Sequence, residues 1–161
     1  MNERYIRQIM IPEIGEAGQE KLKNAKVLIV GIGGLGSPIS LYLTAAGVGQ
    51  IGLIDDDIVS KSNLQRQILY TEAEIGQSKV ECACRRLSAL NSSTRFETYP
   101  NRFTPDNANR LVSAYDIIVD GCDNAATRYL IDDVCSRFKK PYVYGSCLLY
   151  TSPSPRDRTR S

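Results

Sequence analysis

The 161-residue sequence has no histidine and no pair of cysteines in a Cys-x-x-Cys spacing. Histidines and closely spaced cysteines are the usual zinc ligands, so these residues alone do not predict a zinc site. The five cysteines are odd in number and form no paired framework. We therefore expect buried or free thiols in a reducing compartment.

The sequence also lacks long apolar runs and a strong excess of charge. No run approaches the roughly 18 apolar residues that a membrane-spanning helix needs, and the N-terminus lacks the layout of a signal peptide. The net charge is +2, from 20 Lys and Arg against 18 Asp and Glu, which does not indicate a nucleic-acid binder. We expect a cytoplasmic protein without nucleic-acid or membrane partners.

Short apolar runs alternate with segments of helical spacing. The run at 26–31 is β-branched and almost entirely apolar, which is typical of a strand buried on both faces. Strands are expected at residues 26–31, 51–54, 94–99, 116–120 and 141–145, and helices within 4–23 and at 37–46, 78–90, 106–114 and 124–139. This alternation predicts an α/β fold: a Rossmann-like, doubly wound, mostly parallel sheet with helices on both faces.

The composition changes near the C-terminus. Residues 148–161 contain two prolines and three arginines without apolar periodicity, so we expect a disordered or artefactual tail, such as the end of a truncated or chimeric reading frame. Residues 1–147 are expected to form one nucleotide-binding domain.

A glycine-rich segment, Gly31-Ile32-Gly33-Gly34-Leu35-Gly36, joins the first expected strand to a helix. Glycines in this position let the chain turn tightly and approach a phosphate, and the N–H groups of the helix start favour an anion. Asp55 ends the next strand, where a carboxylate can accept hydrogen bonds from a ribose. A tight turn without a ligand is the alternative interpretation.

Two cationic positions follow. Arg66 lies in Ser62-Asn63-Leu64-Gln65-Arg66-Gln67, and its planar guanidinium is suited to phosphate oxygens. Lys79 lies at the start of an expected helix, against the helix dipole, which suggests a phosphate neighbour. The alternatives are a solvated polar loop for the first and an ordinary surface lysine for the second.

Asp123 and Asn124 follow the strand expected at 116–120. Ligands of open α/β sheets bind at this edge, and a carboxylate there can hold a magnesium ion that bridges phosphates. The same two residues could instead cap the helix that begins there.

Taken together, these motifs resemble the ThiF/MoeB/HesA adenylyltransferases, which are relatives of the ubiquitin-activating enzymes. The opening Arg4-Tyr5-Ile6-Arg7-Gln8 also matches the family's N-terminal Arg-Tyr-x-Arg-Gln motif, and the resemblance covers residues 4–146. It implies a nucleotide site made of a phosphate turn, ribose-binding carboxylates, phosphate contacts and a magnesium ligand. The phosphate turn would comprise Gly31, Gly33, Gly34 and Gly36, and the ribose-binding carboxylates would be Asp55 and Asp57. The phosphate contacts would be Asn63, Arg66 and Lys79, and the magnesium ligand would be Asp123, followed by Asn124.

The resemblance implies that the C-terminal glycine carboxylate of a ubiquitin-like sulfur-carrier protein attacks the α-phosphorus of ATP. Pyrophosphate leaves, and catalysis rests on Arg66, Lys79 and Asp123, with Arg7 reaching the partner's nucleotide across a homodimer. Family members usually continue for roughly another hundred residues, often with Cys-x-x-Cys zinc pairs that this chain lacks. For that reason an inactive nucleotide-binding interaction protein stays open as an alternative. Gly33, Gly34 and Asp55 also allow a second alternative, an NAD- or FAD-dependent oxidoreductase.

Overall fold

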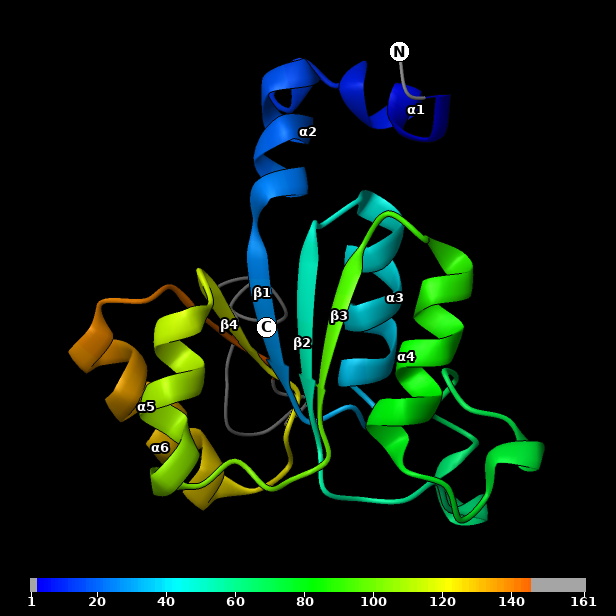
Figure 1. Cartoon of the computed structure of the whole chain (residues 1–161), viewed down its shortest axis with the longest axis vertical. Coiled ribbons are helices and arrows are strands. Elements are labelled where there is room, and N and C mark those ends of the chain that lie inside the picture. The colour runs from blue at the N-terminus through cyan, green and yellow to red at the C-terminus, as the bar shows by residue number, and fades with distance from the viewer. Residues whose placement is uncertain (1–2, 146–161) are drawn as a thin grey trace, which may run out of the picture.

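The computed structural model describes residues 3–145, which form a five-stranded parallel sheet (Figure 1). The strand order is β3-β2-β1-β4-β5, so β1 lies in the middle and the chain crosses it after β3. This confirms the expected Rossmann-like fold. The expected domain end at residue 147 and the tail at 148–161 lie outside the described residues.

The strands agree with the apolar runs of the sequence to within two residues. Their bounds are β1 Lys26–Val30, β2 Gln50–Ile54, β3 Arg95–Tyr99, β4 Ile117–Asp120 and β5 Tyr142–Tyr144. The two central strands are buried almost throughout, as β-branched runs covered on both faces should be. β3 and β5 form the edges, and Val143 and Tyr144 of β5 are about half exposed.

Helices cover both faces of the sheet (Figure 1). The bounds are α3 Gly36–Ala46, α4 Lys79–Leu90, α5 Pro105–Ala114 and α6 Ala125–Phe138. One core joins α3 and α4 to the sheet through residues such as Ile29, Leu53 and Leu87. A second core joins α5 and α6 through Leu28, Leu111 and Ile131. Two separate cores on the two faces are what a doubly wound sheet requires.

The first residues form an arm beyond the amino ends of the strands, made of a short 3-10 helix, α1 Ile6–Ile9 and α2 Gly15–Asn24 (Figure 1). The Asn91 Nδ2 atom donates to the Tyr5 hydroxyl at 2.8 Å, and Gln8 and Gln19 both donate to the Ala46 carbonyl at 3.0 Å. The arm is thus fixed to the end of α3, at the edge of the sheet opposite the carboxyl ends of the strands. No helix within residues 3–145 is long and apolar enough to span a bilayer.

Candidate functional site

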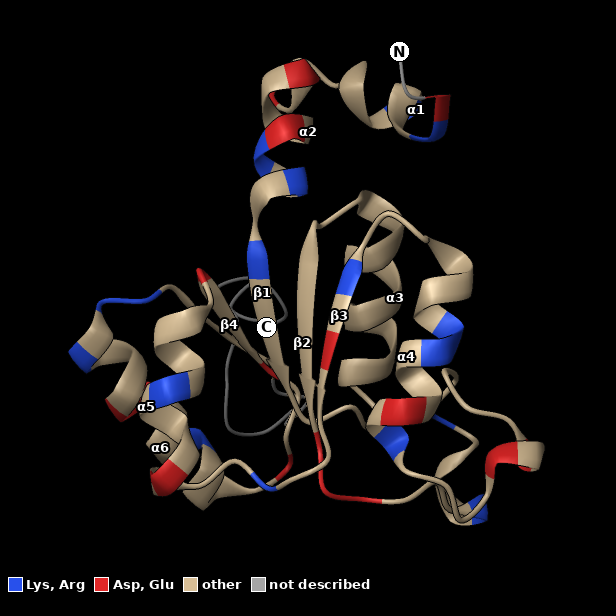
Figure 2. Cartoon of the chain, in the orientation of Figure 1, with Lys and Arg blue, Asp and Glu red and all other residues tan. Residues whose placement is uncertain are grey.

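A cavity of about 670 Å³ lies at the carboxyl ends of β1, β2 and β4. The order in which successive strands are added reverses between β1 and β4, and this switch point is the usual ligand position of open α/β folds. Both acidic and basic residues gather at this edge (Figure 2). Except for Gly36, every residue predicted to hold the nucleotide lines the cavity: Gly31, Gly33, Gly34, Asp55, Asp57, Asn63, Arg66, Lys79, Asp123 and Asn124.

The glycine-rich turn between β1 and α3 has two kinds of glycine. Gly31 has a φ of +86°, and a Cβ there would lie 2.9 Å from the Cys122 nitrogen. A Cβ on Gly36 would lie 2.0 Å from the Gly31 carbonyl oxygen. These two glycines are therefore required by the turn itself, whether or not a ligand binds. Gly33 and Gly34 are different, because an added Cβ would meet only the Gln67 or Arg66 side chain, at 3.4 Å.

Asp55 braces this turn against the end of β2. Its Oδ2 atom accepts a hydrogen bond from the Ile32 nitrogen at 2.7 Å, and Oδ1 accepts one from the Asp57 nitrogen at 2.9 Å. The side chain is only partly buried, and an ionised carboxylate can accept more than two hydrogen bonds. It can therefore hold the turn and still receive a sugar hydroxyl.

The two predicted cations have opposite environments. Lys79 is only 3% exposed, and its Nζ atom lies 2.8 Å from Oδ2 of Asp57, whose side chain is 66% exposed. The interpretation of Lys79 as a surface lysine is therefore wrong. Arg66 is exposed, and its guanidinium donates to the Asn63 side-chain oxygen at 3.3 Å. Both positive groups line the cavity.

Asp123 and Asn124 line the cavity from the loop between β4 and α6. The Asn124 side chain accepts from the Thr127 nitrogen at 3.2 Å, so it caps α6. Asp123 is exposed and makes no hydrogen bond or ion pair with any other residue between 3 and 145. A free carboxylate beside a phosphate-sized space fits Mg²⁺, which takes one or two carboxylates together with substrate phosphates.

A buried ion pair that the sequence motifs did not predict lies beside this loop. Asp120, at the end of β4, is fully buried, and its Oδ2 atom lies 3.3 Å from the Arg128 Nε atom. Oδ1 accepts from the Cys122 nitrogen at 2.8 Å, and Oδ2 also accepts from the Tyr142 hydroxyl at 3.1 Å. Arg128 lies in the first turn of α6, against the helix dipole. That is the signal that drew attention to Lys79, and it could have identified Arg128 as well.

Ionisation near this pair follows from its burial and charge. Burial, together with the hydrogen bond and negative charge of Asp120, raises the pKa of the Cys122 thiol to about 11. Burial, with the charge and hydrogen bond of Asp120, likewise raises the pKa of Tyr142. Burial opposes the charge of Arg128, but the Asp120 carboxylate outweighs it, so the pKa of the guanidinium is raised. At neutral pH the Arg128 guanidinium therefore keeps its charge, and the protonated Cys122 thiol is a poor nucleophile.

Arg7 is the one predicted catalytic residue that does not line the cavity. It is exposed on α1, in the arm at the opposite edge of the sheet (Figure 1). Within one chain it does not lie at the site, so its predicted role concerns a second copy and stays a prediction.

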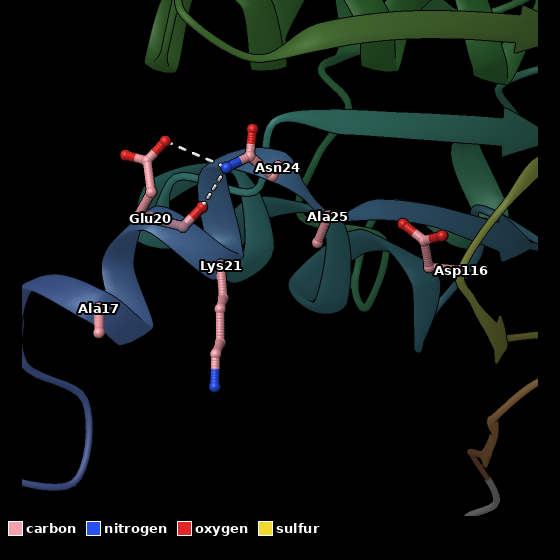
Figure 3. A pocket seen from close by; sticks show the side chains of 6 residues that line it. All are labelled: Ala17, Glu20, Lys21, Asn24, Ala25 and Asp116. Carbon is pink, nitrogen blue, oxygen red and sulfur yellow. Dashed lines mark hydrogen bonds between the residues drawn. The ribbon is translucent and has the colours of Figure 1, made fainter.

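A second hollow of about 550 Å³ lies beside α2 (Figure 3). Its residues include Glu20, Lys21, Asn24 and Asp116. Asn24 donates to the Glu20 carbonyl at 2.9 Å, while the Lys21 and Asp116 side chains point away from each other. No polar groups converge there, so it is a weak candidate for a site.

The ThiF family model matches residues 5–154. This chain belongs to the ThiF family. Among its relatives, a sulfur carrier protein adenylyltransferase of Thermus thermophilus is 48% identical over 144 residues, which are 89% of this chain and 53% of the relative. An adenylyltransferase and sulfurtransferase MOCS3 of Culex quinquefasciatus is 53% identical over 145 residues, or 90% and 33% of the two chains. The chain thus spans about half or less of the length of these relatives.

Solved structures agree with this ThiF fold. The Escherichia coli tRNA N6-threonylcarbamoyladenosine dehydratase TcdA, in complex with ATP, superposes with a TM-score of 0.83 at 30% identity, covering 88% of this chain and 58% of that one. Escherichia coli MccB, with AMPCPP and MccA, gives 0.80 at 32% identity, covering 90% and 44%. The predicted family resemblance is therefore confirmed.

Proposed function

We propose that this chain carries the nucleotide-binding part of an enzyme that adenylates the C-terminal glycine of a ubiquitin-like sulfur-carrier protein. The observation that carries the proposal is the single cavity that gathers the glycine turn, Asp55, Arg66, Lys79 and Asp123 at one edge of the sheet. The relatives named as adenylyltransferases and the ATP-bound neighbour point to the same chemistry.

The cavity residues suit the parts of ATP in a definite order. Gly33 and Gly34 leave room beside the start of α3, where N–H groups favour a phosphate. Asp55, with Asp57 nearby, would receive the ribose. Asn63, Arg66 and Lys79 would contact the phosphates, since a guanidinium and a buried ammonium both favour polyanions.

The reaction needs no nucleophile from the protein. A carboxylate oxygen of the carrier forms a bond to the α-phosphorus while the bond to pyrophosphate breaks, and an acyl adenylate remains. Arg66 and Lys79 would stabilise the charge that accumulates on the departing phosphates. Mg²⁺, held by Asp123, would supply further neutralisation of the phosphates. In a homodimer, Arg7 would act on the partner's nucleotide.

Two finer statements belong to the same proposal. We place the nucleotide-binding domain at residues 1–147. We also propose a cytoplasmic location, which the four unpaired cysteines of the described residues support. The alternative is a protein that binds the nucleotide through the same cavity but does not catalyse adenylation. An NAD- or FAD-dependent oxidoreductase leaves Arg66, Lys79 and Asp123 without a role.

Thermal unfolding of the full chain tests the nucleotide site. Mg-ATP at about 100 times its Kd should stabilise the protein by about 2.7 kcal/mol, whereas NAD should not. Arg66→Ala removes a charged contact to phosphate and should reduce this stabilisation, with an unchanged melting temperature in the absence of ligand because Arg66 is exposed. A melt raised by NAD and indifferent to ATP would overturn the proposal. Pyrophosphate exchange with an added carrier protein then separates the active from the inactive form.

A further inference from the structure

Arg128 connects three separate pieces of backbone around the cavity. Its Nη2 atom donates to the Cys122 carbonyl at 2.6 Å and to the Gly145 carbonyl at 3.4 Å. Its Nη1 atom donates to the Tyr144 hydroxyl at 3.0 Å, and the Tyr144 ring lies 5.0 Å from the guanidinium carbon. With the ion pair to Asp120, these contacts join α6, the end of β4 and the end of β5. We call the two charged residues the Asp120–Arg128 latch.

Burying the two charges of the latch costs desolvation free energy, so the latch is an inefficient way to stabilise a core. Asp120 is fully buried, and the Arg128 side chain is only 18% exposed. The Arg128 Nε atom is buried without a well-aligned hydrogen bond, although it lies near Asp120. Well-packed apolar side chains are often at least as stable as such a pair. The buried pair is therefore better explained by the backbone segments that it holds in place than by stability alone.

The latch touches the backbone on one side of Asp123, and a helix cap fixes the other side. Asp120 accepts from the Cys122 nitrogen and Arg128 donates to the Cys122 carbonyl, so both polar groups of that peptide residue are held. Asn124 is fixed as the cap of α6. Asp123 lies between these two anchored residues, with its carboxylate exposed on the cavity wall.

We propose that Asp120 and Arg128 are positioning residues that hold the β4–α6 loop so that Asp123 meets the metal–nucleotide complex. The inference rests on the proposed function, because it needs a Mg-ATP site at this cavity. It adds two residues that act through Asp123 without touching the nucleotide. Groups that orient a metal ligand in this way typically change metal affinity by about 10- to 100-fold when they are altered.

The test compares ATP binding in the presence of Mg²⁺ and in EDTA, by isothermal titration of the full chain. Arg128→Lys keeps the charge but loses the planar fork that holds several acceptors at once. We expect about 10- to 100-fold weaker binding of Mg-ATP, with ATP affinity in EDTA within about 2-fold of the wild type. Arg137→Lys is the matched control on the same helix, because Arg137 makes only a surface pair with Asp133.

The double variant Arg128→Lys/Asp123→Ala separates positioning from direct contact. If Arg128 acts through Asp123, the double variant binds Mg-ATP no more weakly than Asp123→Ala alone. Three results would each overturn the inference. They are a double variant whose loss of Mg-ATP affinity is the product of the two single losses, an equal loss of ATP affinity in EDTA for Arg128→Lys, and unchanged Mg-ATP binding by Arg128→Lys. If Arg128→Lys does not fold, Tyr142→Phe is the second variant, because it removes one hydrogen bond to Asp120. We expect a smaller loss of ATP affinity that is again seen only with Mg²⁺. An unchanged Mg-ATP affinity in Tyr142→Phe would also overturn the inference. A wild type that binds no ATP would instead remove the proposed function itself.

Discussion

The two sides of the cavity use positive charge in opposite ways. On the β1–β2 side, Arg66 is exposed with one side-chain contact, and Lys79 is paired with the exposed carboxylate of Asp57. On the β4 side, Arg128 is largely buried and bonded to two carbonyls, a hydroxyl and a carboxylate. The cations of the first side are available to a ligand, whereas both terminal nitrogens of Arg128 already donate to protein acceptors.

This difference teaches how to separate ligand-binding from structural charges in one cavity. Cavity lining alone does not do so, because Arg66, Lys79 and Arg128 all line the cavity, as Arg102 does. What separates them is the number of protein acceptors around each cation and the exposure of its counter-charge. Substitution of Arg66 or Lys79 should therefore change ligand binding first, whereas substitution in the Asp120–Arg128 pair should change stability as well as binding.

The largest effect is expected for Asp120→Asn. The variant keeps the shape of the side chain but leaves the Arg128 guanidinium buried without its counter-charge. Breaking a buried pair in this way costs about 3–5 kcal/mol. Urea denaturation should show this loss of unfolding free energy.

Asp133→Asn is the surface control for that substitution. Asp133 pairs with Arg137 on the outside of α6, with both side chains more than half exposed, and the substitution should cost less than about 1 kcal/mol. Equal stability losses in Asp120→Asn and Asp133→Asn would contradict the description of Asp120–Arg128 as a buried pair that the fold depends on.

A smaller loss of stability is expected from the glycine turn on the β1–β2 side, and two of its glycines should differ in this loss. Gly36→Ala places a Cβ against the Gly31 carbonyl oxygen, and we expect a loss of about 3 kcal/mol, the upper end for overpacking. Gly34→Ala meets only the flexible Arg66 side chain, so its stability should stay within about 0.5 kcal/mol while Mg-ATP affinity falls. Chemical denaturation and titration of both variants check this. A stable Gly36→Ala protein would show that the turn can relax.

Much of this fold was predictable because its signals are local. The apolar run of β1 and the glycines that follow it place a strand, a turn and a helix in consecutive residues. The parallel sheet then follows from the alternation of elements, and it brings the carboxyl ends of β1, β2 and β4 to one edge. For this reason Asp55, Arg66 and Asp123, which are far apart in the sequence, could be assigned to one site.

The buried contacts were not predictable, because they depend on packing between distant segments. Arg128 is buried by Tyr144, which lies 16 residues further along the chain. Lys79 is buried at the start of a helix where the sequence pattern favours exposure, and its partner Asp57 is 22 residues away. Tyr5 meets Asn91 across 86 residues. Local propensity carries no information on such pairings.

The smallest expected effect concerns pH and belongs to the β4 side. Folding raises the pKa of Cys122 from its usual value of 9.0 to about 11. The folded chain therefore holds this proton more tightly than the unfolded chain does. The contribution to stability is complete below pH 9 and disappears as the pH rises from 9 to 11.

Urea denaturation under reducing conditions at pH 8, 9 and 10 measures this contribution. The unfolding free energy of the wild type should fall with pH, and Cys122→Ala should fall less steeply. Some dependence should remain in the variant, because burial also raises the pKa of Cys135 to about 11. Cys135 lies in the core between α6 and the sheet, so Cys135→Ala is the matched comparison from outside the cavity. If Cys122→Ala keeps the full wild-type slope, the Cys122 thiol is not held in the environment that Asp120 and the end of β4 provide.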